Sequence, residues 1–109
     1  MLAFELDDLE ATRSANGRAY HEFVAVPALS LGLYVLPAGG VDRQQPHGED
    51  EAYYVLRGRA QISVGDEVRD DRPGSVVFVG ASVPHRFHDI DEELALLVAF
   101  GPAEGSSGA

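Results

Sequence analysis

From Tyr20 onward the chain alternates short apolar segments with turn residues. In residues 29–36 an apolar side chain occupies every second position from Leu29 to Val35, which is the period of a β-strand. Comparable segments recur at residues 20–26, 52–56, 60–64, 75–79, 85–89 and 94–100. Gly58 and Gly65 end two of these segments, at places where a positive φ is expected. Roughly seven short strands with regular turns and no long helix predict an all-β sandwich or barrel.

The two ends of the chain follow different patterns. Residues 2–13 carry Leu6 and Leu9 at helical spacing but are rich in aspartate, so an ordered arm or a single turn is as consistent with them as a helix. The last residues are rich in glycine and serine, which predicts a disordered tail. The expected organisation is an N-terminal arm over 1–19, one barrel domain over 20–102 and a tail over 103–109.

Composition narrows the class of protein. A chain of 109 residues with 45% hydrophobic content forms one domain with one core and is not disordered as a whole. Eighteen acidic residues against eight basic ones give a net charge of −10, which repels nucleic acid. The first twenty residues are too acidic and polar for a signal peptide or a membrane span, so a cytoplasmic protein is expected.

Candidate metal ligands gather in the middle of the sequence. The chain has no cysteine, so a metal would have to use histidine, carboxylate or amide groups. Gln45 and His47 lie two residues apart and would share one face of an extended segment, with Glu51 following and His85 further along. Two imidazoles and a carboxylate that converge inside a barrel would bind a transition metal and leave coordination positions open.

This segment resembles the first motif of the cupin family, G-x5-H-x-H-x3,4-E-x6-G. The matching positions are Gly39, Gln45, His47, Glu51 and Gly58. A later segment resembles the second cupin motif, G-x5-P-x-G-x2-H-x3-N. Its corresponding positions are Gly74, Gly80, Ser82, His85 and Asp89, where Gly80, Ser82 and Asp89 stand in place of the proline, second glycine and asparagine of the motif. The resemblance, which extends over about residues 20–100, implies an all-β double-stranded β-helix, the jelly-roll barrel of small single-domain cupins, with the site inside it.

The resemblance also implies a ligand set. His47, Glu51 and His85 would hold a divalent transition metal, with Fe, Mn, Ni, Zn, Co and Cu all open. Gln45 stands where the family has a histidine, and an amide oxygen is a harder and weaker ligand than an imidazole nitrogen. Gln45 is therefore expected either to be a weak fourth ligand or to hydrogen-bond a metal-bound water.

Other side chains near the motifs are expected at the pocket wall or on the surface. Tyr53, Phe78 and Phe87 are the aromatic residues expected to line the pocket. Glu49 and Asp50 are expected to face solvent. His88 falls on the opposite strand face from His85 and is expected to be structural. His21 could lie at the barrel mouth or on the surface.

Two classes of function remain open. One is a metal-dependent enzyme of the dioxygenase, isomerase, cyclase or lyase type acting on a small organic molecule, and the other is a non-catalytic binder or sensor of a small ligand. The sequence singles out no acid–base or nucleophile set apart from the ligands. A homodimer is also expected, because Tyr34, Leu36 and Leu97 make neighbouring strands apolar on both faces.

Overall fold

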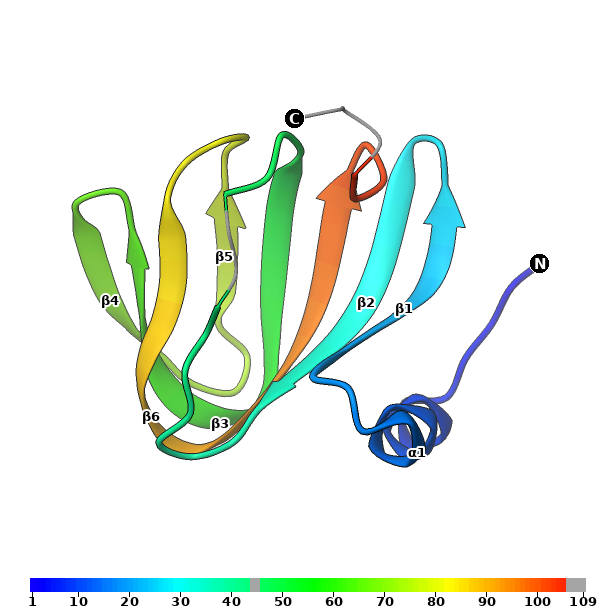
Figure 1. The fold of residues 1–109 in the computed structure, drawn as a ribbon, viewed down its shortest axis with the longest axis horizontal. Coiled ribbons are helices and arrows are strands. Elements are labelled where there is room, and N and C mark those ends of the chain that lie inside the picture. Colours follow the sequence, from blue (N-terminus) through cyan, green and yellow to red (C-terminus); the bar gives the residue numbers. More distant parts are fainter. Residues whose placement is uncertain (44–45, 106–109) are drawn as a thin grey trace.

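The computed structural model describes residues 1–43 and 46–105, which form one helix and an antiparallel sheet curled into a barrel (Figure 1). In chain order the elements are α1 (Leu6–Asn16), β1 (Tyr20–Val26), β2 (Leu29–Leu36), β3 (Asp50–Val64), β4 (Glu67–Asp71), β5 (Val76–Val79) and β6 (His85–Gly101). The prediction of an all-β barrel is confirmed. Within the described residues, no helix has the length and apolar character that a membrane span requires.

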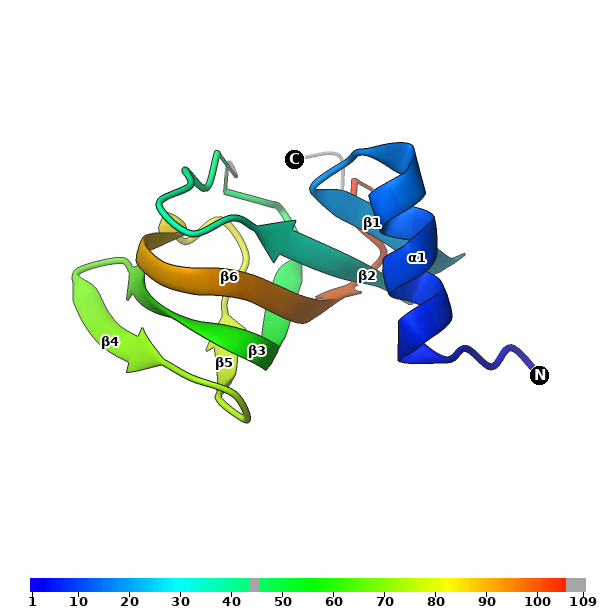
Figure 2. The same cartoon turned by 90° about the horizontal axis from the view of Figure 1, so that it is seen from below.

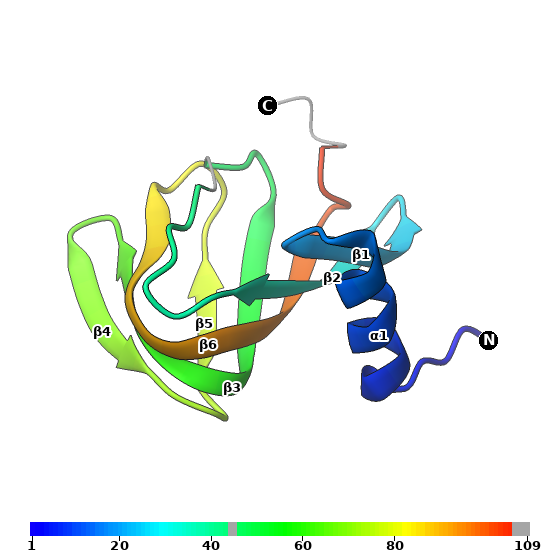
Figure 3. The same cartoon turned by 60° about the horizontal axis from the view of Figure 1, so that its bottom comes forward.

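The two longest strands, β3 and β6, organise the barrel. The sheet has the order β1-β2-β6-β3-β4, and β5 pairs with the first part of β3. β6 pairs with β3 along both halves, from Asp50 opposite Gly101 to Val64 opposite His85. The sequence predicted each of these strands as two separate ones. They are continuous and curve strongly, as Figures 2 and 3 show, so that one pair of strands contributes to both halves of the barrel.

The curvature of β3 is concentrated at Gly58. This residue has φ +93°, and the pairing with β6 shifts register on both sides of it. A Cβ atom there would lie 2.2 Å from the carbonyl oxygen of Glu93, so only glycine fits the close approach of the two strands. The predicted positive φ is therefore confirmed at Gly58, and also at Gly65, where φ is +59°. Residues 91–93, predicted as a turn, form the matching irregular part of β6.

The sequence did not reveal β4. This strand reads Glu-Val-Arg-Asp-Asp and has one buried residue, Asp71. It pairs with β3 only and lies at the edge of the sheet, so most of its side chains face water and no apolar alternation marks it. Charged side chains on an edge strand also discourage pairing with other chains.

The helix accounts for a second apolar face. The main core fills the barrel and includes Tyr34 and Leu36. A smaller cluster lies on the other face of β2 and β6, where Leu9 of α1 packs with Leu33, Val35 and Ala95. Figure 2 shows α1 beside β1 and β2. Leu33 and Val35 on the outer face of β2 thus have partners within one chain, whereas Leu29 is exposed.

An ion-pair network fixes α1 to the barrel. Arg57 of β3 contacts the carboxylate of Glu10 on the helix, and its second terminal nitrogen lies 2.6 Å from Glu93 of β6. These two contacts raise the pKa of the Arg57 guanidinium above its usual value. The network joins the helix to both long strands close to the Gly58 bend.

Candidate functional site

A carboxylate and an imidazole meet inside the barrel. Glu51 is the second residue of β3, and His85 is the first residue of β6. Their side chains are each 1% exposed, and His85 Nε2 lies 3.0 Å from Glu51 Oε1. This burial follows from the alternation of side chains along a strand. Glu51 and Tyr53, two residues apart in β3, both point into the barrel, and so do His85 and Phe87 in β6.

The protein fixes which nitrogen of His85 faces the carboxylate. Nδ1 lies 2.8 Å from the carbonyl oxygen of Val83, an acceptor only, so Nδ1 carries the proton that it donates. Nε2 lies 3.1 Å from the hydroxyl of Tyr53, which donates to it when the imidazole is neutral. Nε2 is thus the nitrogen left for a proton or a metal. A backbone acceptor on the other ring nitrogen is a common feature of histidine ligands.

Glu51 is buried without its hydrogen-bond partners. Both carboxylate oxygens are inaccessible, and neither accepts a hydrogen bond of normal geometry from a described residue. Its close charge contact is the 3.0 Å approach of His85. Burial alone would lower the pKa of His85, but the contacts with Glu51 and Val83 and the charges of Glu51 and Asp42 raise it above its usual value. A lone buried carboxylate is costly, so this pair favours a cation at Nε2.

His47 lies beside this pair without closing a ligand set. Its ring centroid is 6.3 Å from that of His85, and it packs edge-on against Phe100 with centroids 4.9 Å apart. Its Nδ1 lies 3.8 Å from Glu104 Oε2. In residues 1–43 and 46–105, no three His, Cys, Asp or Glu side chains converge closely enough to hold a metal as they stand. Gln45 lies outside the described residues.

A small cavity opens next to His47. Its volume is about 120 Å³, and it is lined by Tyr20, Tyr34, His47, Val98, Phe100 and Glu104. The Tyr20 hydroxyl is inaccessible and has no hydrogen-bond partner among the described residues. Burial and the neighbouring glutamates, Glu104 first among them, raise the pKa of Tyr20. Burial likewise raises the pKa of Glu104, although His47 opposes that change.

The three aromatic residues expected at the pocket divide into two groups. Tyr53 and Phe87 are both 1% exposed inside the barrel, where their rings meet edge to face with centroids 4.9 Å apart. Phe78 does not line the barrel, because Val77 and Val79 take the inward positions of β5 and leave Phe78 67% exposed on the outer face. The prediction that Phe78 lines the pocket is therefore wrong, because its position in β5 points outward.

The acidic neighbours of the motif also differ from expectation. Asp50 is exposed, but Glu49 is 3% exposed and its Oε1 accepts a hydrogen bond from the amide of Gly105. Glu49 is therefore not solvent-facing, because the segment after β6 covers it. His88 lies between Ser63 Oγ and Asp89 Oδ2, at 2.6 Å and 2.7 Å, away from His85.

Two further acidic residues contribute to the site although the sequence did not single them out. Asp42 accepts hydrogen bonds from the Tyr34 hydroxyl, at 2.7 Å, and from the Phe87 amide, at 2.9 Å. It thereby ties the motif loop to β2 and β6. Glu104 lies in the segment predicted to be a disordered tail. Asp42 could have been suspected from its place inside the first motif, whereas nothing in the sequence around Glu104 marks it.

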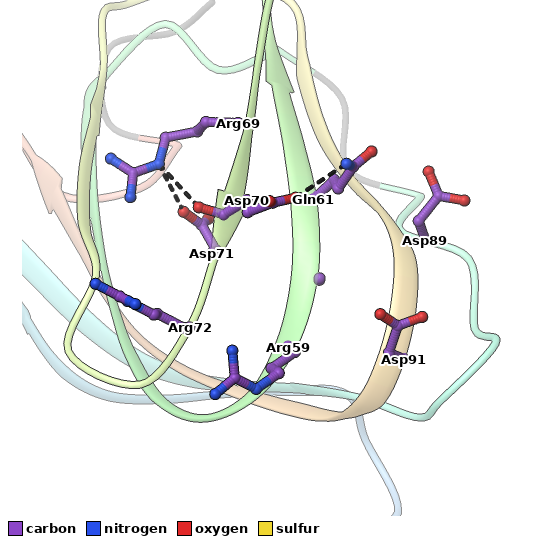
Figure 4. A pocket seen from close by; sticks show the side chains of 9 residues that line it. Arg59, Gln61, Arg69, Asp70, Asp71, Arg72, Asp89 and Asp91 are labelled. Atoms are coloured by element: carbon purple, nitrogen blue, oxygen red, sulfur yellow. Dashed lines mark hydrogen bonds and ion pairs between the residues drawn. The ribbon is translucent and has the colours of Figure 1, made fainter.

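A larger pocket, of about 480 Å³, lies away from these residues. Figure 4 shows its charged lining, which comprises Arg59, Arg69 and Arg72, Asp70 and Asp71 of β4, and Asp89 and Asp91 of β6. Burial raises the pKa of Asp71, while Arg69, whose Nε is 3.2 Å from Asp71 Oδ1, opposes this. A lining that mixes three arginines with four aspartates selects no single charge of ligand, so the motif residues remain the better candidate site.

Comparison with known proteins gives a consistent family assignment. Residues 32–100 match the family model of the Cupin domain. The uncharacterized protein SCO3923 of Streptomyces coelicolor is 52% identical over 95% of this chain and 99% of its own length. The crystal structure of TT1209 from Thermus thermophilus is 26% identical, with a TM-score of 0.72 over 94% of this chain and 98% of that one.

An enzyme is also among the similar structures. DMSP lyase DddQ from Ruegeria pomeroyi DSS-3 is 26% identical, with a TM-score of 0.71 over 76% of this chain. The present chain spans 46% of that lyase.

Proposed function

Because this chain belongs to the Cupin domain family, we propose that it binds a divalent transition metal and uses it in an enzymatic reaction on a compact organic molecule. The proposed ligands are His47, Glu51 and His85. Gln45 would be a weaker fourth ligand or a partner of metal-bound water. The metal is one of Fe, Mn, Ni, Zn, Co or Cu, all of which accept imidazole and carboxylate ligands.

The observation that supports this proposal most strongly is the state of Glu51. A carboxylate 1% exposed, with neither oxygen hydrogen-bonded by a described residue, costs several kcal/mol, on the order of the penalty for an uncompensated buried ion. Its close cationic neighbour among the described residues is His85, whose Nε2 is left for a proton or a metal. A divalent cation between Glu51 and His85 would satisfy both groups.

The protein's own residues would position a substrate beside this centre. When bound, a divalent metal polarises a carbonyl group or lowers the pKa of a bound water. The wall of Tyr20, Tyr34 and Phe100 would exclude bulk water and select a compact, largely apolar molecule, because the cavity is only about 120 Å³. The buried Tyr20 hydroxyl, which lacks a partner among the described residues, would donate a hydrogen bond to an acceptor on the substrate.

The reaction class is proposed from the relatives. The likeness to DMSP lyase DddQ supports a lyase, within the wider range of dioxygenase, isomerase and cyclase chemistry expected from the sequence. Since the chain spans 46% of that lyase, we propose only the type of reaction for this chain and not the substrate of the lyase. The alternative, a non-catalytic binding protein, would use the same cavity. It would bind the small molecule without converting it to a product.

Metal binding can be tested directly. Chelator-treated, untagged protein should bind one divalent ion per chain in calorimetric titrations with Mn, Fe, Co, Ni and Zn. His47→Ala and His85→Ala should each abolish retention after dialysis, because each removes one of three strong ligands. Gln45→Ala should weaken binding, while Gln45→His should tighten it by supplying an imidazole.

His88→Ala is the matched control, since this histidine contacts Ser63 and Asp89 and not the site. It should leave the metal content unchanged. Full metal occupancy in His47→Ala after dialysis against a chelator would show the ligand assignment to be wrong. In that case a metal-free, small-molecule binder becomes the better function.

We also propose that the protein is a homodimer. Its apolar residues Leu2, Phe4 and Leu6 are 72%, 45% and 40% exposed and lie along a groove that continues over β2 and β6 to Leu97. Burial of such a surface against a second copy would stabilise both. Light scattering at micromolar concentration should give twice the chain mass of 11.7 kDa. A mass of 11.7 kDa across that range would contradict the dimer.

A further inference from the structure

The segment that follows β6 is tied to the barrel by three consecutive backbone amides. Ala103 donates to the carbonyl of Pro27, at 3.3 Å, and Glu104 donates to Ser30 Oγ, at 2.9 Å. Gly105 donates to Glu49 Oε1, at 3.1 Å. We call residues 103–105 the strap. Its anchors lie in the β1–β2 turn, in β2 and in the residue just before β3.

Two of the three anchors are buried polar side chains. Ser30 is fully buried and Glu49 is 3% exposed, yet neither contributes to the apolar core. A buried hydroxyl and a buried carboxylate are stabilised only when hydrogen-bonded, and the strap amides supply donors to both. Ala103 itself is 9% exposed. Two buried polar side chains therefore serve to hold one short segment in a fixed place.

The strap places one functional group at the site. The Glu104 side chain lines the small cavity and brings Oε2 to 3.8 Å from His47 Nδ1. On the other imidazole of the site, His85, Nδ1 is held by the carbonyl of Val83 and Nε2 faces Glu51. In both histidines an oxygen acceptor therefore lies near Nδ1. A carboxylate or carbonyl at the second ring nitrogen fixes the orientation of a histidine ligand and raises its basicity.

We propose that Glu104 is the positioning residue for His47: its carboxylate accepts a hydrogen bond from Nδ1, which directs Nε2 of His47 to the metal bound by Glu51 and His85. This inference rests on the proposed metal function. It assigns a role to a residue outside both cupin motifs. The present separation of 3.8 Å must shorten by roughly 1 Å for this hydrogen bond to form.

The test is a titration of chelator-treated protein with Co(II) alone, followed by calorimetry and by the absorption spectrum of the bound ion. Glu104→Gln should lower the affinity by about 10- to 100-fold, the usual cost of losing such a partner. Glu104→Asp should recover part of the loss because it restores the carboxylate. Ser30→Ala should weaken binding in the same direction, since it releases the Glu104 amide without changing any charge.

Glu22→Gln is the matched control for charge. Glu22 acts on Glu104 and Tyr20 through its charge, and it does not stand beside His47 as Glu104 does. If Glu104→Gln and Glu22→Gln reduce the affinity equally, the effect is general electrostatics and the inference is overturned. If the wild type and Glu104→Gln bind Co(II) equally well, the role of Glu104 is overturned and the proposed metal function stands. A wild-type protein that does not bind Co(II) overturns both.

Discussion

The metal-free protein is expected to lose stability as the pH rises above about 6.5, and a divalent metal is expected to restore it. The cause is the contact between Glu51 and His85. In the absence of metal, the positive charge that stabilises the buried Glu51 carboxylate is a proton on His85. The pKa of His85 is raised in the folded protein by that pairing, against the opposing effect of burial. An unfolded histidine has a pKa of about 6.5.

The direction follows from proton binding. Because the folded state binds this proton more tightly, its contribution is fully present below a pH of about 6.5 and is lost as the pH rises through the folded pKa of His85. A metal replaces the same proton, so its affinity increases over this range of pH. At a metal concentration of about 100 times Kd, the free energy of unfolding should increase by about 2.7 kcal/mol.

Urea unfolding of chelator-treated protein at a series of pH values measures both effects. Glu51→Gln provides the comparison, because it keeps the shape of the side chain and removes the charge. This variant should show a shallower pH dependence above about 6.5 and almost no gain in stability on addition of metal. The same pH dependence in Glu51→Gln and wild type would mean that the pair does not control stability.

Gly58→Ala is expected to be among the most destabilising single substitutions in this barrel. The residue has φ +93°, and the new Cβ would lie 2.2 Å from the carbonyl oxygen of Glu93 and 2.7 Å from the Cα of Leu94. Both atoms belong to the backbone of β6, so no side chain can move aside. Backbone strain and overpacking together should lower the free energy of unfolding by about 3–5 kcal/mol.

Gly74→Ala separates the two causes. Gly74 has the same φ, +93°, but nothing lies within 4 Å of the position that its Cβ would take. Its substitution should cost only the conformational strain, about 1–3 kcal/mol. Thermal or urea unfolding of the two variants gives the difference directly. Equal losses would show that the close approach of β3 and β6 at Gly58 has no energetic consequence.

The sequence predicted the barrel well because its strands carry local signals. The bounds of β1 and β2 agree with the predicted 20–26 and 29–36, since proline, glycine and apolar alternation all mark them. Both Glu51 and His85 were predicted as inward-facing neighbours, and the structure brings them together. Their role as metal ligands stays a prediction.

What the sequence did not reveal depends on contacts between distant segments. The continuity of β3 through Gly58 is set by its pairing with β6, and local turn residues could not show it. The burial of Glu49 depends on the amide of Gly105, which lies 56 residues further along the chain. Phe78 was misassigned because β5 is a short strand of four apolar residues, whose two faces look alike in sequence.

The continuity of β3 and β6 has a consequence for how the barrel opens. Both strands run through both halves, and their pairing extends from Asp50 to Val64. There is consequently no seam along which one half could detach while the other stays folded, and the two strands form one cooperative unit. Glu51 and His85 belong to this unit. Their contact is therefore expected to persist until the barrel unfolds as a whole.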